Sequence, residues 1–167
     1  GLVGSEMCIR HRLKSSMASF LNAMTFPDKT VYPFATPNET DFKNLMDVYL
    51  NAVFCPLAMV DKSVFEQEGW HYELDLPEGA EGEGGAASLR EGTLRYNGVV
   101  FNEMKGALSD PMSVLDDAVN AALYPDTAYA HESGGDPRAI PALTYEQFLD
   151  THARHYNPSN SYITLYG

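Results

Sequence analysis

Glu103 is the residue whose type and setting point most directly to chemistry. It lies in the run from 98 to 106, GVVFNEMKG, where apolar and small residues surround one carboxylate. Acidic side chains are seldom buried unless a cation, a strong hydrogen-bond donor or a metal accompanies them. If the run is helical, Glu103 shares one face of the helix with Val99, Val100, Gly106 and Ala107. Periodicity alone leaves two interpretations open, a functional buried carboxylate and an ordinary surface or capping glutamate.

A metal site would need further ligands, and the sequence offers few. His152 and His155 are three residues apart, a spacing that lets two helical histidines share a metal ion. We favour the interpretation that one of them packs on the core while the other faces solvent. His71, next to Trp70, is predicted to be structural. Neither His-Glu-x-x-His nor His-x-x-Glu-His occurs in the 167 residues, so the sequence predicts part of an active site rather than a whole one.

Motifs for other kinds of chemistry are missing from the sequence. It contains no Gly-x-Ser-x-Gly nucleophile elbow. The segment 133–136, SGGD, lacks the Lys-Ser or Lys-Thr ending of a phosphate loop and is predicted to be a turn. Cys55, between Phe54 and Pro56, is predicted to be a small core residue rather than a nucleophile.

Charge and composition narrow the class of protein. The chain has 167 residues, 44% of them hydrophobic, which is enough for a folded core. Its formal net charge is −12, whereas nucleic acids and anionic membranes are bound by basic surfaces, so neither is expected as a partner. No apolar run approaches the roughly 20 residues of a transmembrane helix. Cys8 and Cys55 do not make a disulfide framework, which favours a reducing compartment.

The elements that position these residues are predicted from turns, caps and periodicity. Residues 17–26 and 30–34 are expected to form a hairpin around a turn at 27–29. A helix should begin with Thr36 as N-cap and Pro37 as N1, and it should stop at Pro56.

The remaining elements alternate between short strands and helices. They are expected as a short helix or turn over 61–68, strands over 70–74, 94–96 and 161–166, and helices over 99–108 and 111–123. The helix over 111–123 should have Asp110 as N-cap and Pro111 as N1, and a last helix should begin with a capping box between Thr144 and Gln147 and end before Pro158. Loops are expected over 77–92, which is rich in glycine and glutamate, and over 124–143. This mixture predicts an α+β fold, with helices packed on one face of a mainly antiparallel sheet.

The amino-terminal residues differ in character from the rest. The opening GLVGSEMCIR resembles the translation of a sequencing-library adapter, so residues 1–12 are interpreted as a non-native segment. We therefore expect 13–167 to be a partial domain whose amino-terminal piece is missing.

Several longer motifs occur together in a fixed order. They are 20–28 (FLNAMTFPD), 32–33 (YP), 41–50 (DFKNLMDVYL), 67–70 (QEGW), 98–106 (GVVFNEMKG), 133–137 (SGGDP) and 156–160 (YNPSN). The set resembles the presequence protease group of the pitrilysin-like zinc metallopeptidases, over roughly 13–167. Several motifs in order make this resemblance far more specific than any one of them.

The resemblance implies a metal role for Glu103. Members of the family are long chains of related α+β domains, paired in two halves around a chamber, that cut unstructured peptides such as cleaved targeting presequences. Their zinc is held by an inverted His-x-x-Glu-His helix and a more distant glutamate, which the motif places at Glu103. The His-x-x-Glu-His helix would precede the strand at 20–26, so two Zn²⁺ ligands and the general base are absent here. The fragment alone is therefore expected to be inactive.

The resemblance also implies a substrate site and partners. Asn22 and Ala23 match the segment that lines the cleavage site, where an extended substrate adds to a sheet edge. The alternative is an ordinary edge strand. Expected partners are unstructured peptides and the remaining domains of the same polypeptide. The implied compartment is the mitochondrial matrix or plastid stroma in a eukaryote, and the cytoplasm in a bacterium.

A second hypothesis belongs to a different functional class. Related domains without the zinc helix occur in this family, so the chain could instead be a non-catalytic domain that binds peptides or scaffolds a partner. The sequence upstream of Leu13 separates the two hypotheses. A carboxylate at 103 favours the enzyme, because a domain without a metal has no need of one there.

Overall fold

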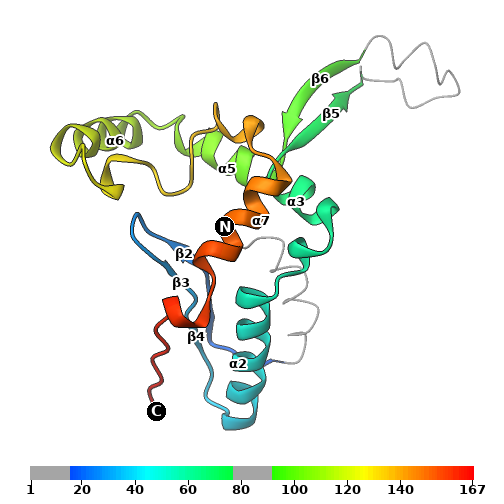
Figure 1. The fold of residues 1–167 in the computed structure, drawn as a ribbon, viewed down its shortest axis with the longest axis vertical. Helices are drawn as coiled ribbons and strands as arrows, with labels where there is room; N and C mark the ends of the chain where they lie inside the picture. The colour runs from blue at the N-terminus through cyan, green and yellow to red at the C-terminus, as the bar shows by residue number, and fades with distance from the viewer. Residues whose placement is uncertain (1–15, 77–91) are drawn as a thin grey trace, which may run out of the picture.

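A long, interrupted β-hairpin opens the described part of the chain. The computed structural model describes residues 16–76 and 92–167. β1 (Phe20–Leu21) pairs with β4 (Phe34–Ala35), and β2 (Met24–Thr25) pairs with β3 (Thr30–Val31), both antiparallel. The two short ladders follow one register, so they form a single hairpin whose turn is closed by Phe26 N donating to Lys29 O at 2.8 Å (Figure 1). This confirms the hairpin predicted from the sequence.

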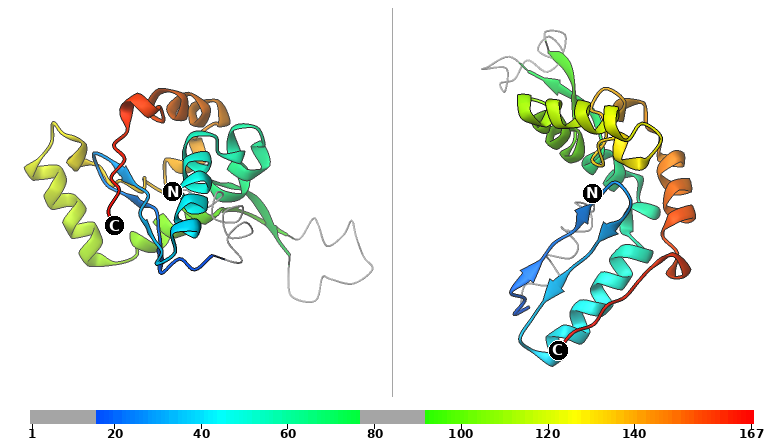
Figure 2. Two further views of the ribbon diagram at one scale, coloured as in Figure 1. Left: turned by 90° about the horizontal axis from the view of Figure 1, so that it is seen from below. Right: turned by 90° about the vertical axis from the view of Figure 1, so that its left-hand side faces the viewer.

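Helix α2 (Glu39–Phe54) runs alongside this hairpin. The ring of Phe34 lies 5.2 Å from Phe42 and 5.3 Å from Tyr49, which packs β4 onto the helix (Figure 2). Leu45, on the same helix, is fully buried. The helix ends just before Pro56, as expected, since proline cannot continue the hydrogen-bond pattern.

The N-cap of α2 differs from the prediction. Asn38, not Thr36, is the capping residue, and its side chain accepts a hydrogen bond from Asp41 N at 2.9 Å. The Thr36 hydroxyl instead donates to Asp41 Oδ2 at 2.8 Å. Thr36 is thus engaged by the Asp41 carboxylate, and the cap falls two residues later than predicted.

A second group of elements carries the Glu103 helix. Its members are η1 (Leu57–Met59), α3 (Lys62–Glu68), β5 (His71–Asp75), β6 (Thr93–Asn97), α5 (Val99–Ala107) and α6 (Pro111–Leu123). β5 and β6 pair antiparallel and project away from the helices (Figure 1). Asp110 caps α6 through Met112 N and Ser113 N, with Pro111 in the first turn, as the sequence predicts.

The long connection over 124–143 contains two 3₁₀ turns, η2 (Ala128–Ala130) and η3 (Ile140–Ala142). α7 (Tyr145–His155) follows, with the predicted capping box between Thr144 and Gln147, and η4 (Pro158–Asn160) comes after it. The predicted strand over 161–166 is wrong for the structure described, because this stretch is extended but pairs with no described strand.

The core is small and centres on α5. Phe101, Met104 and Ile140 are buried together, with Trp70 and Val100 packed against them. The described strands form three separate two-stranded ladders beside helices. A helix-covered sheet of the pitrilysin-like type therefore stays a prediction. The expected non-native segment 1–12 and most of the expected loop at 77–92 lie outside the described residues.

Among the residues that the structure describes, no single helix is long and apolar enough to cross a membrane. The segments Glu39–Met59 and Lys62–Glu68 pass the test of length and composition only as a pair, with a 97° bend between them.

Candidate functional site

The start of α5 is fixed by a close approach of two backbones. Gly98 is buried with φ of +149°, a conformation that favours glycine, and a Cβ there would lie 2.7 Å from Trp70 Cα and closer still to Gly69 O. Phe101 N donates to the same Gly69 O at 3.3 Å. The helix that carries Glu103 is thereby held against the segment between α3 and β5.

An amide cluster orients the first turn of α5. Asn97 Oδ1 accepts from Gly98 N at 2.9 Å and from Asn102 Nδ2 at 2.6 Å. Asn97 Nδ2 donates in turn to Glu73 Oε2 at 2.9 Å, and Arg95 Nε donates to the same oxygen at 3.2 Å. Asn102 immediately precedes Glu103, so these contacts limit rotation of the helix about its axis.

The loop around Ser133 braces the buried side of α5. A Cβ on Gly134 would lie 2.7 Å from Met104 Cε and closer to its sulfur, so the loop packs directly against this side chain. Ser133 Oγ donates to Thr25 O in β2 at 3.4 Å. The predicted turn at 133–136 is confirmed at its first two residues, and it links the hairpin to the Glu103 helix.

Glu103 lies on the exposed side of α5, opposite these contacts. Its face is open: Val99 is 39% exposed, and a Cβ on Gly106 would meet nothing within 4 Å. Within 16–76 and 92–167, no group of three or more His, Cys, Asp or Glu side chains could hold a metal ion. The described residues therefore do not form a zinc site by themselves, and the role of Glu103 as a ligand stays a prediction.

Asn22 and Ala23 lie in the gap between β1 and β2, and both are exposed. Asn22 N donates inward to Pro33 O at 3.1 Å, which keeps the hairpin in register across the gap. The next amide, Ala23 N, donates to the Asn22 side chain at 2.8 Å. Because successive amides of an extended segment point in opposite directions, Ala23 N faces the edge of the hairpin that pairs with no other described strand, here called the free edge.

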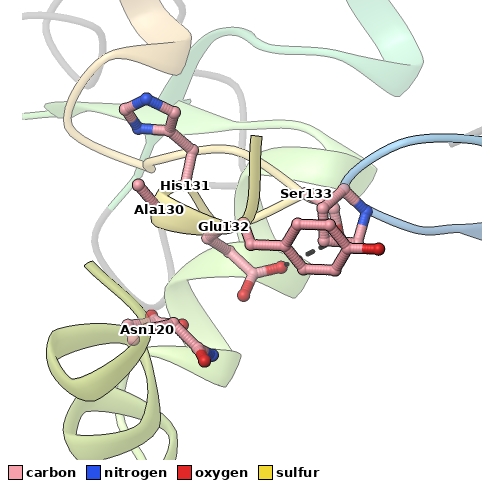
Figure 3. Close-up of a pocket in the computed structure, with 8 residues that line it drawn as sticks. Asn120, Ala130, His131, Glu132 and Ser133 are labelled. Atoms are coloured by element: carbon pink, nitrogen blue, oxygen red, sulfur yellow. Dashed lines mark hydrogen bonds between the residues drawn. The ribbon is translucent and has the colours of Figure 1, made fainter. Parts of the chain in front are cut away.

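A polar pocket lies where the hairpin turn, α6 and the long connection meet (Figure 3). Its lining includes Pro27, Asp117, Asn120, His131, Glu132 and Ser133. Burial and the nearby negative charge of Glu132 raise the pKa of Asp117 above its ordinary value. Sequence reasoning missed this cluster, because its members are distant in sequence and share no spacing rule.

The two helical histidines behave as the favoured interpretation predicts. His152 is buried, its Nε2 is 2.9 Å from Val53 O, and its ring stacks on Tyr156. His155 is exposed. His71 Nδ1 lies 2.9 Å from Glu66 O, in keeping with a structural role.

The prediction for Cys55 is wrong. The side chain is exposed rather than part of the core. Its apolar neighbours suggested burial, but the residue is the C-cap of α2, where the chain turns away from the helix.

Comparison with known proteins finds relatives that share almost the whole length of this chain. No protein-family model matches it. Presequence protease 1, chloroplastic/mitochondrial, of Arabidopsis thaliana is 48% identical over 155 residues, which are 93% of this chain and 13% of that protein. The mitochondrial presequence protease of Mus musculus is 44% identical over 156 residues, 93% of this chain and 14% of that protein. The chain is a relative of the presequence proteases.

A bacterial protein belongs to the same set of relatives. Protein HypA of Clostridium perfringens (strain 13 / Type A) is 54% identical over 155 residues, 93% of this chain and 15% of HypA. The chain thus spans between 13% and 15% of the length of these relatives. The relationship to the presequence proteases confirms the resemblance seen in the ordered motifs.

Proposed function

We propose that this chain is a segment of a zinc metalloendopeptidase that degrades short unstructured peptides, such as cleaved targeting presequences. The observation that carries the proposal is the 44–48% identity, over 93% of the chain, to proteins named presequence proteases. Those relatives are named mitochondrial or chloroplastic, which supports a matrix or stromal location for a eukaryotic protein. For a bacterial protein the proposed location is the cytoplasm, which rests on the resemblance alone.

In this proposal Glu103 supplies one carboxylate ligand to zinc. It is exposed on a helix whose other side is anchored by Gly98, Asn97 and the loop at Gly134. The small, open face around it leaves room for a second element to approach. A zinc ion with three protein ligands activates a bound water and polarises a carbonyl. The other ligands and the general base would come from elsewhere in the polypeptide, so this chain alone would be inactive.

The hairpin supports the peptide-binding half of the proposal. Asn22 and Ala23 occupy its free edge, and the small Ala23 side chain lets another backbone come close. An extended peptide could pair there by β-augmentation, with main-chain hydrogen bonds providing affinity without a fixed sequence. That mode suits a peptidase of varied, unfolded substrates.

Glu103→Gln in the full-length protein tests the metal role. Glutamine keeps the size of the side chain but loses the charge, so zinc content and peptidase activity should fall together. We expect activity to drop by more than about 100-fold, because even outer-shell partners of metal ligands cost 10–100-fold. Zinc is measured by elemental analysis and activity with a fluorogenic unstructured peptide.

The matched control is Glu39→Gln, which alters an exposed glutamate that pairs with Lys43 in α2. It should leave zinc content and activity unchanged. Normal zinc occupancy in the Glu103 variant would remove this residue from the ligand set. A full-length protein that binds peptides but contains no zinc would favour the non-catalytic hypothesis instead.

A further inference from the structure

A partly buried contact between two tyrosines, Tyr32 in the hairpin and Tyr156 after α7, lies directly across from Ala23. Leu21 pairs with Phe34 and Met24 pairs with Val31, so this register puts Ala23 opposite Tyr32 and Asn22 opposite Pro33. Tyr32 Oη lies 3.0 Å from Tyr156 Oη. This contact joins two residues 124 positions apart, from the middle of the hairpin to the end of α7.

The contact continues into the helices behind the hairpin. The Tyr156 ring stacks on His152 with 4.6 Å between centroids and 8° between planes. His152 Nε2 lies 2.9 Å from Val53 O in α2. Tyr32 is therefore connected through Tyr156 and His152 to α7 and α2.

The environment keeps this hydrogen bond intact. Burial, and then the hydrogen bond with Tyr156, raise the pKa of Tyr32 above its ordinary value. A hydroxyl buried without a partner carries a desolvation cost, so each tyrosine makes the other hard to displace.

Two other hydrogen bonds join the hairpin to the 124–143 connection, and both are longer and more exposed. Near the turn, Tyr129 Oη donates to Asp28 Oδ2 at 3.3 Å, and Ser133 Oγ donates to Thr25 O at 3.4 Å. Both of these contacts are solvent-exposed, whereas the Tyr32–Tyr156 contact is partly buried. The tyrosine contact also falls at the break between the two ladders, where the strands have fewest hydrogen bonds of their own.

We propose that Tyr32 and Tyr156 are positioning residues that hold the Asn22–Ala23 edge in place for an extended peptide. The inference rests on the proposed peptide-binding role of that edge. Neither tyrosine needs to touch the peptide. Their hydrogen bond fixes the partner strand from behind, so that the free edge presents a preformed row of main-chain groups and less ordering is needed when a peptide pairs with it.

The test removes the hydroxyls one at a time in the full-length protein. Tyr32→Phe and Tyr156→Phe keep the rings and their packing. Each should raise KM for a fluorogenic unstructured peptide about three- to tenfold, the range expected for loss of one hydrogen bond, with kcat changed less than about twofold. The double variant should be no worse than either single variant, because each single change already breaks the same bond.

A second measurement reports the local stability of the hairpin independently of catalysis. Amide hydrogen exchange across 19–26 should become faster in Tyr32→Phe, while exchange in α6 should not change. Tyr129→Phe is the matched control, because it removes a tyrosine hydroxyl that contacts the hairpin at its exposed turn. It should leave both KM and exchange at Asn22 unaltered.

The outcomes separate this inference from the proposed function. Unchanged KM and unchanged exchange in Tyr32→Phe would overturn the inference, and so would additive effects of the two tyrosine changes. Faster exchange with unchanged KM would also overturn it, because the edge would then not serve peptide binding. If Glu103→Gln leaves zinc and activity intact, the metal assignment fails, while a raised KM in the tyrosine variants still supports the positioning role.

Discussion

At the scale of single residues, Asp117 makes stability depend on pH. It lies in the pocket between α6 and the 124–143 connection, where Glu132 faces it and Asp116 is its neighbour on the helix. Burial, then the charge of Glu132, raise the pKa of Asp117 above its ordinary value of 3.8. A carboxyl whose pKa is raised by folding favours the folded state at pH values below its unfolded pKa, and this contribution is lost as the pH rises through the folded pKa.

Asp117→Asn should therefore stabilise the protein near neutral pH. Asparagine cannot ionise, so the repulsion from Glu132 disappears. Because Asp117 is only partly buried, solvent screens the repulsion, and we expect a gain of no more than about 0.5 kcal/mol. Urea unfolding at pH 7 and at pH 3 checks this, because the gain should vanish at the lower pH, where the native carboxyl is already protonated. An equal gain at both pH values would mean that charge is not its cause.

At the scale of elements, the sequence predicts those turns and helix caps that depend on residues close together in the chain. The hairpin turn at 27–29, the Asp110 cap of α6 and the capping box of α7 each depend on residues close together in the chain, and all three are confirmed. The stretch 161–166 has the composition of a strand, but a strand also needs a partner, which composition cannot supply. The Asn38 cap was missed because the Thr36 hydroxyl, predicted to cap the helix, bonds the Asp41 side chain instead.

The candidate site also has features that the local sequence predicts and features that depend on distant residues. The helix over 99–107 could be predicted from its periodicity, and its motif singled out Glu103 through resemblance. The direction of that side chain could not be predicted, because it depends on which residues of α5 the distant Ile140 and Gly134 cover. The Tyr32–Tyr156 contact was missed for the same reason, since no spacing rule links residues in a hairpin and at the end of a helix.

The junction between β6 and α5 gives a prediction about a whole element. Gly98→Ala would push a methyl group against Trp70 Cα and Gly69 O at a positive φ. The helix would have to move, and we expect a loss of about 1–3 kcal/mol in the free energy of unfolding. Gly106→Ala is the matched control on the same helix, where the new methyl meets open space. It should be neutral or stabilising by up to about 1 kcal/mol, because alanine favours helix. Similar losses in both variants, seen in urea unfolding, would contradict the close approach.

At the scale of the whole molecule, large apolar side chains remain exposed on several elements. On α6, Met112 is 60% and Leu123 64% exposed, and Tyr162 in the extended stretch after η4 is wholly exposed. Apolar surface of this kind is typical of interaction sites. The chain also spans no more than 15% of the length of its relatives. A test of function should therefore give the chain the surroundings of a complete protein.

A chimera with a full-length relative places the chain within a complete protein. Residues 13–167 would replace the matching segment of the Arabidopsis thaliana presequence protease, to which the chain is 48% identical. If the chain serves the same role, the chimera should cleave a presequence peptide within about tenfold of the parent rate, which corresponds to about 1.4 kcal/mol of the barrier. Glu103→Gln in the chimera should abolish cleavage and zinc binding together, and Glu39→Gln should affect neither. A folded, zinc-containing chimera that does not cleave would count against the peptidase assignment, because it would retain the metal and lack only what this segment contributes to the substrate site.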